Sequence, residues 1–193
     1  MIPGFLTTDL LRQGHQRAYY FGLGFIQIKM NERERYHFYA KELPAIVDTP
    51  HNRRYDFKSQ ILAGTFHNFI WVEDELGPWF EMTQENCKPP GTEGSMKIRP
   101  AIANFKRLIQ FDHKTYHAGQ SYFMDHNTLH TVQATECITF LERSAYRKDE
   151  SDVAVPKGGS IVCPFSHKIS DDDLWQIVDR MLKEHKPDDA VIL

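Results

Sequence analysis

Short runs of aromatic and β-branched residues dominate the hydrophobic pattern of this 193-residue chain. Each run has the length of a strand, and Gly, Pro, Asn or Asp separates most neighbouring runs. A series of this kind predicts an antiparallel sandwich or barrel, and thus an all-β fold. The predicted strands are residues 25–30, 34–40, 57–64, 66–74, 105–113, 119–125, 129–135 and 137–144.

The spacing of apolar residues becomes helical near both ends of the chain. Ser170 can cap a first turn that carries three aspartates at the positive end of the helix dipole. This predicts a helix over residues 171–186 that packs on the outside of the sheet. A shorter helix is predicted around residues 7–18. The apolar stripe of the C-terminal helix consists of Leu174, Ile177, Val178, Met181 and Leu182.

Two polar segments interrupt the strand pattern. Residues 87–100 contain three prolines and two glycines, which predicts a loop between strands. Residues 147–160 predict a polar connection to the C-terminal helix. The length favours a single domain over residues 1–193, with a barrel core at about 20–145 and a helical extension at 165–193.

Charge and cysteine content narrow the functional classes. The chain has 23 basic and 26 acidic residues, which gives no electrostatic reason to expect nucleic acid or an anionic membrane as a partner. It has no apolar run of the ~20 residues that span a bilayer and no signal-peptide pattern, so we expect a cytoplasmic protein. Its three cysteines form no CxxC motif, which argues against a disulfide framework or a thiolate zinc site.

Two histidine segments carry the candidate chemistry. The first places His51 and Asp56 just before an apolar strand that ends at Gly64. In the second, Gly119 starts a short strand and His130 lies in the next one. Strand alternation points His130 into the predicted barrel, among mainly apolar side chains.

Together the two segments resemble the paired motifs of the cupins, a family of small β-barrels whose interior commonly holds a divalent metal ion. The second cupin motif runs glycine, five residues, proline, one residue, glycine, two residues, histidine. Gly119 and His130 match, whereas Asp125 and Asn127 stand at the proline and the second glycine. Asparagine is a fair substitute for a turn glycine because it tolerates the left-handed conformation.

The first cupin motif runs histidine, one residue, histidine, three or four residues, glutamate, six residues, glycine. His51 and Gly64 match this motif. Arg53 stands at the second histidine, and Phe57 or Lys58 stands at the glutamate. The resemblance covers roughly residues 34–144 and implies a cupin-like antiparallel barrel or jelly roll.

The resemblance also implies a divalent metal ion as cofactor, with Fe(II) favoured and Zn, Ni or Mn as alternatives. His51, Asp56 and His130 would supply a set of two histidines and one carboxylate. In a regular strand Asp56 faces away from His51, so it joins the set only if residues 51–55 form a turn or bulge. His113 and His117 could instead form an all-histidine set with His130.

Arg53, at a position where the family has a ligand histidine, indicates an anionic substrate. A guanidinium forms a bidentate pair with a carboxylate or phosphate, and we expect Arg53 to anchor such a group beside the metal. Arg54 has the opposite parity and is expected in solvent. We predict His130 and Arg53 as catalytic residues and, besides Arg53, three substrate-binding residues: Tyr55, Tyr122 and Arg143.

Three functions are compatible with these residues. The resemblance favours a metal-dependent oxygenase, with non-haem iron, that acts on a small anionic molecule held in the barrel. The alternatives are an isomerase or epimerase with His130 or His51 as the base, and a cupin that binds a small ligand without catalysis. Because cupins often pair through N-terminal strands, we also expect a homodimer formed by residues 20–40.

Overall fold

The computed structural model describes residues 2–3, 6–13, 17–86, 97–160, 162, 164–165 and 167–186. Its strands form one nine-stranded sheet in the order β1-β2-β3-β8-β4-β6-β5-β9, with β7 paired to β4. Every pairing is antiparallel, which confirms the all-β fold. The strands are Ala18–Phe21 (β1), Phe25–Lys29 (β2), Glu34–Tyr39 (β3), Phe57–Glu73 (β4), Trp79–Asn86 (β5), Lys97–His117 (β6), Ser121–Met124 (β7), Leu129–Arg143 (β8) and Ser151–Pro156 (β9).

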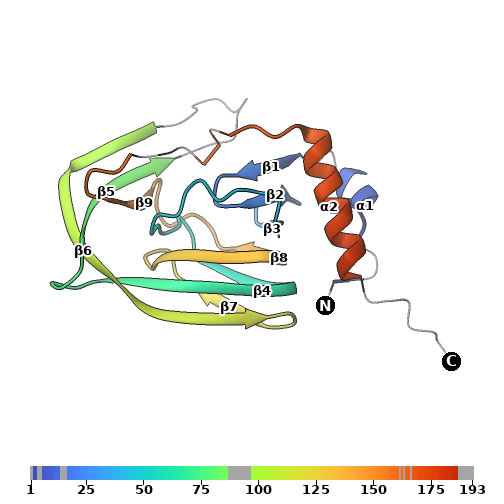
Figure 1. The fold of residues 1–193 in the computed structure, drawn as a ribbon, viewed down its shortest axis with the longest axis horizontal. Helices are drawn as coiled ribbons and strands as arrows, with labels where there is room; N and C mark the ends of the chain where they lie inside the picture. Colours follow the sequence, from blue (N-terminus) through green and yellow to red (C-terminus); the bar gives the residue numbers. More distant parts are fainter. Residues whose placement is uncertain are drawn as a thin grey trace.

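The sheet curls because its long strands bend (Figure 1). β4 and β8 bend together where Gly64, at φ +75°, lies against Glu136, at φ +51°. A Cβ atom at Gly64 would lie 2.2 Å from the Glu136 carbonyl oxygen, so no side chain fits there. The sequence pattern breaks at these two residues, but each predicted pair of strands on either side is one continuous strand.

Residues 50–52, here called the closing segment, lie between β8 and β9 and close the curled sheet. The His51 backbone pairs with His130 of β8, with N–O distances of 3.1 and 2.9 Å. On its other side the segment accepts a hydrogen bond from the Ala154 amide of β9 to the Pro50 carbonyl, at 2.7 Å. This short segment therefore completes a path of strands that runs from β8 through β4, β6, β5 and β9 and back to β8.

Two helices lie outside the sheet, α1 (Thr8–Gln13) and α2 (Asp171–His185). Ser170 caps α2 and accepts a hydrogen bond from the Asp173 amide, as the sequence predicts. Of the helices in the described part of the chain, none has the length and apolar character needed to cross a membrane. α1 is shorter than the predicted helix at residues 7–18, of which 14–16 lie outside the described residues.

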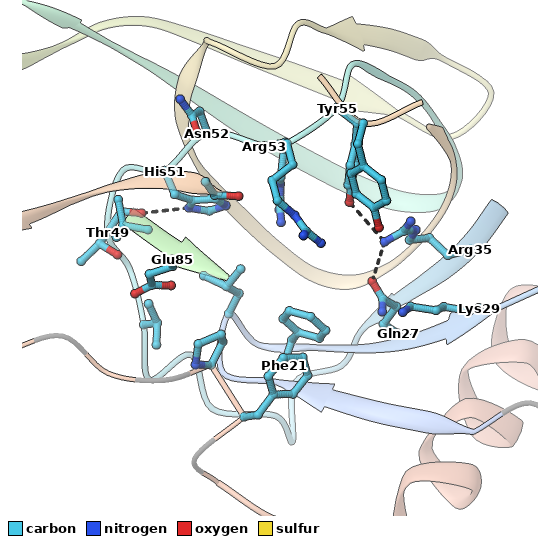
Figure 2. Close-up of a pocket in the computed structure, with 18 residues that line it drawn as sticks. Phe21, Gln27, Lys29, Arg35, Thr49, His51, Asn52, Arg53, Tyr55 and Glu85 are labelled. Carbon is cyan, nitrogen blue, oxygen red and sulfur yellow. Dashed lines mark hydrogen bonds between the residues drawn. The ribbon is translucent and has the colours of Figure 1, made fainter. Parts of the chain in front are cut away.

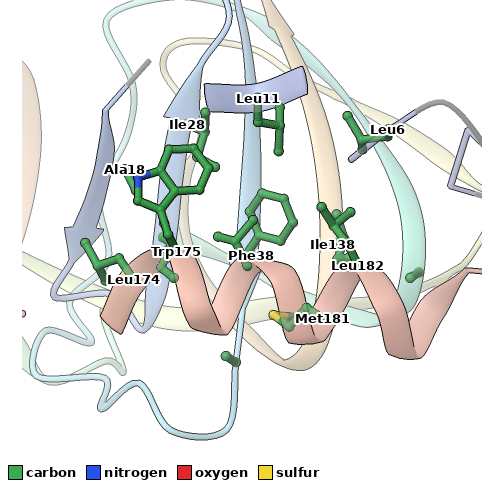
Figure 3. Close-up of a cluster of buried hydrophobic side chains, with 14 of the residues drawn as sticks. Leu6, Leu11, Ala18, Ile28, Phe38, Ile138, Leu174, Trp175, Met181 and Leu182 are labelled. Carbon is green, nitrogen blue, oxygen red and sulfur yellow. The ribbon is translucent and has the colours of Figure 1, made fainter. Parts of the chain in front are cut away.

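The apolar face of α2 packs on β1, β2, β3 and the bend of β8 (Figure 3). Trp175 and Met181 lie against Ile28 and Phe38, and all four side chains are buried. Inside the curled sheet a second cluster is largely aromatic and includes Phe25, Tyr39, Tyr55, Phe57, Phe66 and Tyr122. The sheet is therefore covered on both faces where α2 crosses it.

Three strands, β1, β5 and β9, were absent from the sequence prediction. Residues 147–160, predicted as a polar connection, contain β9. Its three central residues are buried consecutively, so β9 lacks the alternation by which a strand is recognised. Of the predicted loop at 87–100, residues 97–100 belong to β6 and residues 87–96 lie outside the described residues.

Candidate ligand-binding site

A cavity of about 150 Å³ lies between β2, β3 and the segment that leads into β4 (Figure 2). Four basic side chains line it: Lys29, Arg35, Arg53 and Arg54. Among the described residues of the lining, Glu85 is the one acidic side chain. The chain as a whole has a net charge of −3, so the positive charge is a local property of this cavity.

Backbone hydrogen bonds on both sides hold the segment that carries most of the predicted site residues. At one end His51 pairs with His130, and the Asn52 amide donates to the Asp152 carbonyl at 3.0 Å. At the other end the Arg147 amide donates to the Arg54 carbonyl at 2.7 Å. The backbone between these points is fixed, which sets the positions from which its side chains enter the cavity.

The structure brings His51 and His130 together, with their ring centres 5.0 Å apart. His51 Nδ1–H donates to the Thr49 carbonyl and His130 Nδ1–H donates to Asn68 Oδ1, each at 3.0 Å. These hydrogen bonds leave the lone pair of each ring on Nε2. Both Nε2 atoms are buried and have no hydrogen-bond partner among the described residues.

Burial keeps both imidazoles neutral. Together with the positive charge of Arg53, it lowers the pKa of His51 to about 3. Burial, then His51 and Arg53, hold the pKa of His130 well below its usual value. At neutral pH the pair therefore presents two uncharged nitrogen lone pairs.

The positive charge of Arg53 affects several buried histidines. Its charge lowers the pKa values of His51, His130 and the buried His37. Within the described ranges, no hydrogen bond or ion pair joins its guanidinium to another side chain. Figure 2 shows the guanidinium directed into the space between the closing segment and β2.

Arg35, which the sequence analysis did not single out, is the most deeply buried cation of the cavity, at 7% exposure. Its Nη1 donates to Gln27 Oε1 at 3.3 Å and to the Tyr55 hydroxyl at 3.1 Å, whereas its Nε has no partner among the described residues. Burial is the largest cause that lowers its pKa, and the charges of Arg143 and Arg53 lower it further. The sequence sign of a buried Arg35 was its place among aromatic residues in the predicted strand at residues 34–40.

Arg143 and Arg54 extend the positive charge along the wall that Tyr55 and Tyr146 form. The Arg143 guanidinium lies 4.1 Å from the ring centre of Tyr146 and 5.3 Å from that of Tyr55. Arg54, expected in solvent, is half-buried, lines the cavity and stacks on Tyr146 at 4.6 Å. The bend at residues 54–55 breaks the alternation on which that expectation rested.

Asp56 makes other contacts and does not join the histidine pair. Its carboxylate accepts hydrogen bonds from the His126 ring at 2.7 Å and from Arg147 Nε at 3.1 Å. The hydrogen bonds from His126 are the main cause that lowers its pKa. In the described part of the chain, no three His, Cys, Asp or Glu side chains are close enough to hold a metal ion.

The other predicted residues also fall outside the cavity. His113 contacts His67 at 3.1 Å, and His117 contacts Thr65 at 3.3 Å, all in exposed parts of β4 and β6. Tyr122 lies in the interior aromatic cluster, and Tyr122, His130 and Arg143 are not part of the cavity lining. Tyr55, in contrast, lines the cavity as the sequence predicts.

No protein-family model matches this chain, and no curated protein sequence matches it.

Proposed function

We propose that the protein binds a small anionic organic molecule in the cavity, with Arg53 as its anchor. The observation that carries this proposal is the concentration of cations, two buried and one half-buried, that have no carboxylate partner among the described residues. Arg35, Arg53 and Arg143 form no ion pair within the described residues. A buried guanidinium is stable only if its lost hydration is replaced, and an anion replaces it best.

The rest of the lining suits an organic ligand better than a bare inorganic ion. Phe21, Leu23, Val153 and Phe165 contribute apolar surface beside the basic residues. A cavity with apolar walls and a few convergent polar groups is typical of small-molecule sites. The carbon part of the ligand would lie against these walls while its charged group reaches Arg53.

The test is anion-dependent thermal stabilisation of the wild-type protein and of Arg53→Gln. A panel of small carboxylates and inorganic phosphate at constant ionic strength should raise the melting temperature of the wild type, because a ligand that binds only the folded state stabilises it. We expect Arg53→Gln to lose this shift. Arg33→Gln is the matched control, since Arg33 is exposed in the turn between β2 and β3. Equal shifts in all three proteins would refute the proposal.

The second candidate function is metal-dependent chemistry on the bound anion, as in a non-haem iron cupin oxygenase. The observation that favours it is that two neighbouring imidazoles each have an Nε2 atom without a partner among the described residues, with each Nδ1 hydrogen-bonded to a carbonyl oxygen. Metal-binding histidines commonly have this arrangement. His51 and His130 would hold a divalent ion, Fe(II) by preference, and the anionic ligand and water would complete its coordination. When bound, Fe(II) would supply the activation of O₂.

Elemental analysis of protein prepared without chelators or a histidine tag tests the metal proposal. We expect near-stoichiometric metal in the wild type and its loss in His130→Ala and His51→Ala. Asp56→Ala is the control, because its carboxylate is held by His126 and Arg147, and its metal content should stay unchanged. A wild type without metal would leave anion binding as the proposal.

The isomerase or epimerase alternative receives less support. A general base works best with a pKa near the working pH, and His51, with a pKa of about 3, is a weak proton acceptor. The homodimer and the cytoplasmic location stay predictions, and sedimentation of the wild type tests the first of them.

A further inference from the structure

We propose that the ligand is a dianion, with two carboxylate groups at separate positions in the cavity. One carboxylate binds Arg53 beside the two imidazoles, and the other binds Arg35 beside Lys29. This inference rests on the proposed anion-binding function and specifies the charge and the shape of the ligand.

The number of cations is the first argument. Lys29, Arg35 and Arg53 line the cavity, Arg143 lies behind Tyr55, and none of these four has a carboxylate partner within the described residues. Burial lowers the pKa of Lys29, and the charges of Arg35 and Arg143 lower it further, as expected for cations close enough to repel one another. A monoanion would neutralise one of these charges and leave the repulsion among the others.

The separation of the cations into two positions is the second argument. Arg53 directly follows residues 50–52, whose His51 pairs with His130 of β8. Arg35 belongs to β3 and is held by Gln27 and Tyr55. In Figure 2 the two guanidinium groups enter the cavity from different elements, and Arg35 approaches from the side of Lys29.

The orientation of Arg35 is the third argument. Gln27 and Tyr55 occupy its Nη1, so the guanidinium is fixed before any ligand binds. Its buried Nε has no partner in the described residues, although an unpaired buried donor is destabilising. A carboxylate oxygen accepting from Nε would satisfy this donor and pair with the charge at once.

A dicarboxylate fits these features better than a phosphate ester does. A phosphate concentrates its charge at one point, whereas two carboxylates joined by a carbon chain can reach both positions. Between them, the apolar walls that include Phe21 and Phe165 would contact the chain. The carboxylate at Arg53 would lie next to His51 and His130.

The experiment is calorimetric titration with straight-chain dicarboxylates from succinate to adipate, the corresponding monocarboxylates, and inorganic phosphate, at constant ionic strength. We expect one dicarboxylate to bind the wild type about tenfold more tightly than its monocarboxylate, as one further charge-assisted hydrogen bond allows. Arg35→Gln should abolish that preference, because it removes the partner of the second carboxylate. Arg53→Gln should weaken both classes, and Arg33→Gln should weaken neither.

Arg35→Lys serves as a second variant that keeps the charge if Arg35→Gln does not fold, and it should retain part of the preference. Equal affinity for mono- and dicarboxylates, both lost in Arg53→Gln, would refute the dianion and leave the proposed function intact. Tightest binding of phosphate would refute the dicarboxylate in favour of a phosphate group. Absence of binding by every anion would refute the proposed function as well.

Discussion

The two faces of the β2–β3 pair differ in their packing, although most side chains on both faces are buried. On one face Ile26, Ile28 and Phe38 are fully buried against the helices. On the other face, Gln27 and Arg35 are also buried, but they surround a cavity. The same two strands thus carry a well-packed apolar surface and a polar surface on which one buried donor, Arg35 Nε, has no partner among the described residues. The first stabilises the fold, whereas the second suits a ligand.

The largest effect should come from the apolar face. Phe38→Ala removes a fully buried ring between β3 and α2, and we expect it to lower the free energy of unfolding by about 3–5 kcal/mol. Urea unfolding measures this loss. Phe111→Ala is the control, because Phe111 is 71% exposed on β6 and should change stability by less than about 0.5 kcal/mol. Similar losses in both variants would remove the contrast between buried and exposed aromatic residues.

A smaller effect concerns pH and the polar face. Burial, with the charges of Arg35 and Arg53, keeps the pKa of His37 well below its usual value. The unfolded chain, in which this pKa returns to about 6.5, therefore binds more protons below that pH, and stability falls as the pH falls through this range. The slope is up to about 1.4 kcal/mol per pH unit for one histidine. His37→Gln should reduce the slope by that amount in unfolding measured between pH 6.5 and 5, and an unchanged slope would contradict the assignment.

The smallest effect should have the opposite sign. Arg35→Met replaces a buried charge near Arg53 and Arg143 with an apolar side chain of similar length. We expect the free energy of unfolding without ligand to rise by about 1 kcal/mol, because replacing a desolvated charge with a packed apolar side chain is often stabilising. A loss of more than about 1 kcal/mol would mean that Arg35 is part of the structural core and would erase the difference between the faces.

The strands and the C-terminal helix could be predicted because their periodicities are local properties of the sequence. The polar face of β3 could not, because an alternating strand is ordinarily read with its polar residues in solvent. Here α2 covers the outer face, so Arg35 and His37 must point inward. That outcome depends on packing between segments more than 130 positions apart in the chain.

The candidate site could be predicted only in part, because it too depends on contacts between distant segments of the chain. His51 and His130 meet because two distant segments pair, and the motif spacing anticipated that meeting. Asp56 was predicted to join them only if residues 51–55 formed a turn or bulge, but the partners that hold it, His126 and Arg147, come from distant segments. The sequence around Asp56 contains no sign of these partners.

The closing segment has a consequence for the motions of the molecule. His51 and Arg53 lie on or beside the three residues whose hydrogen bonds join β8 to β9. A fluctuation that breaks these bonds would also displace the backbone that positions the imidazole and the guanidinium. The amide protons that join the closing segment to β8 and β9, such as those of His51 and Ala154, would exchange with solvent during the same local unfolding that disrupts the site. A bound ligand would therefore slow the exchange of these amide protons without contacting them. Their exchange rates would then indicate whether the cavity is occupied.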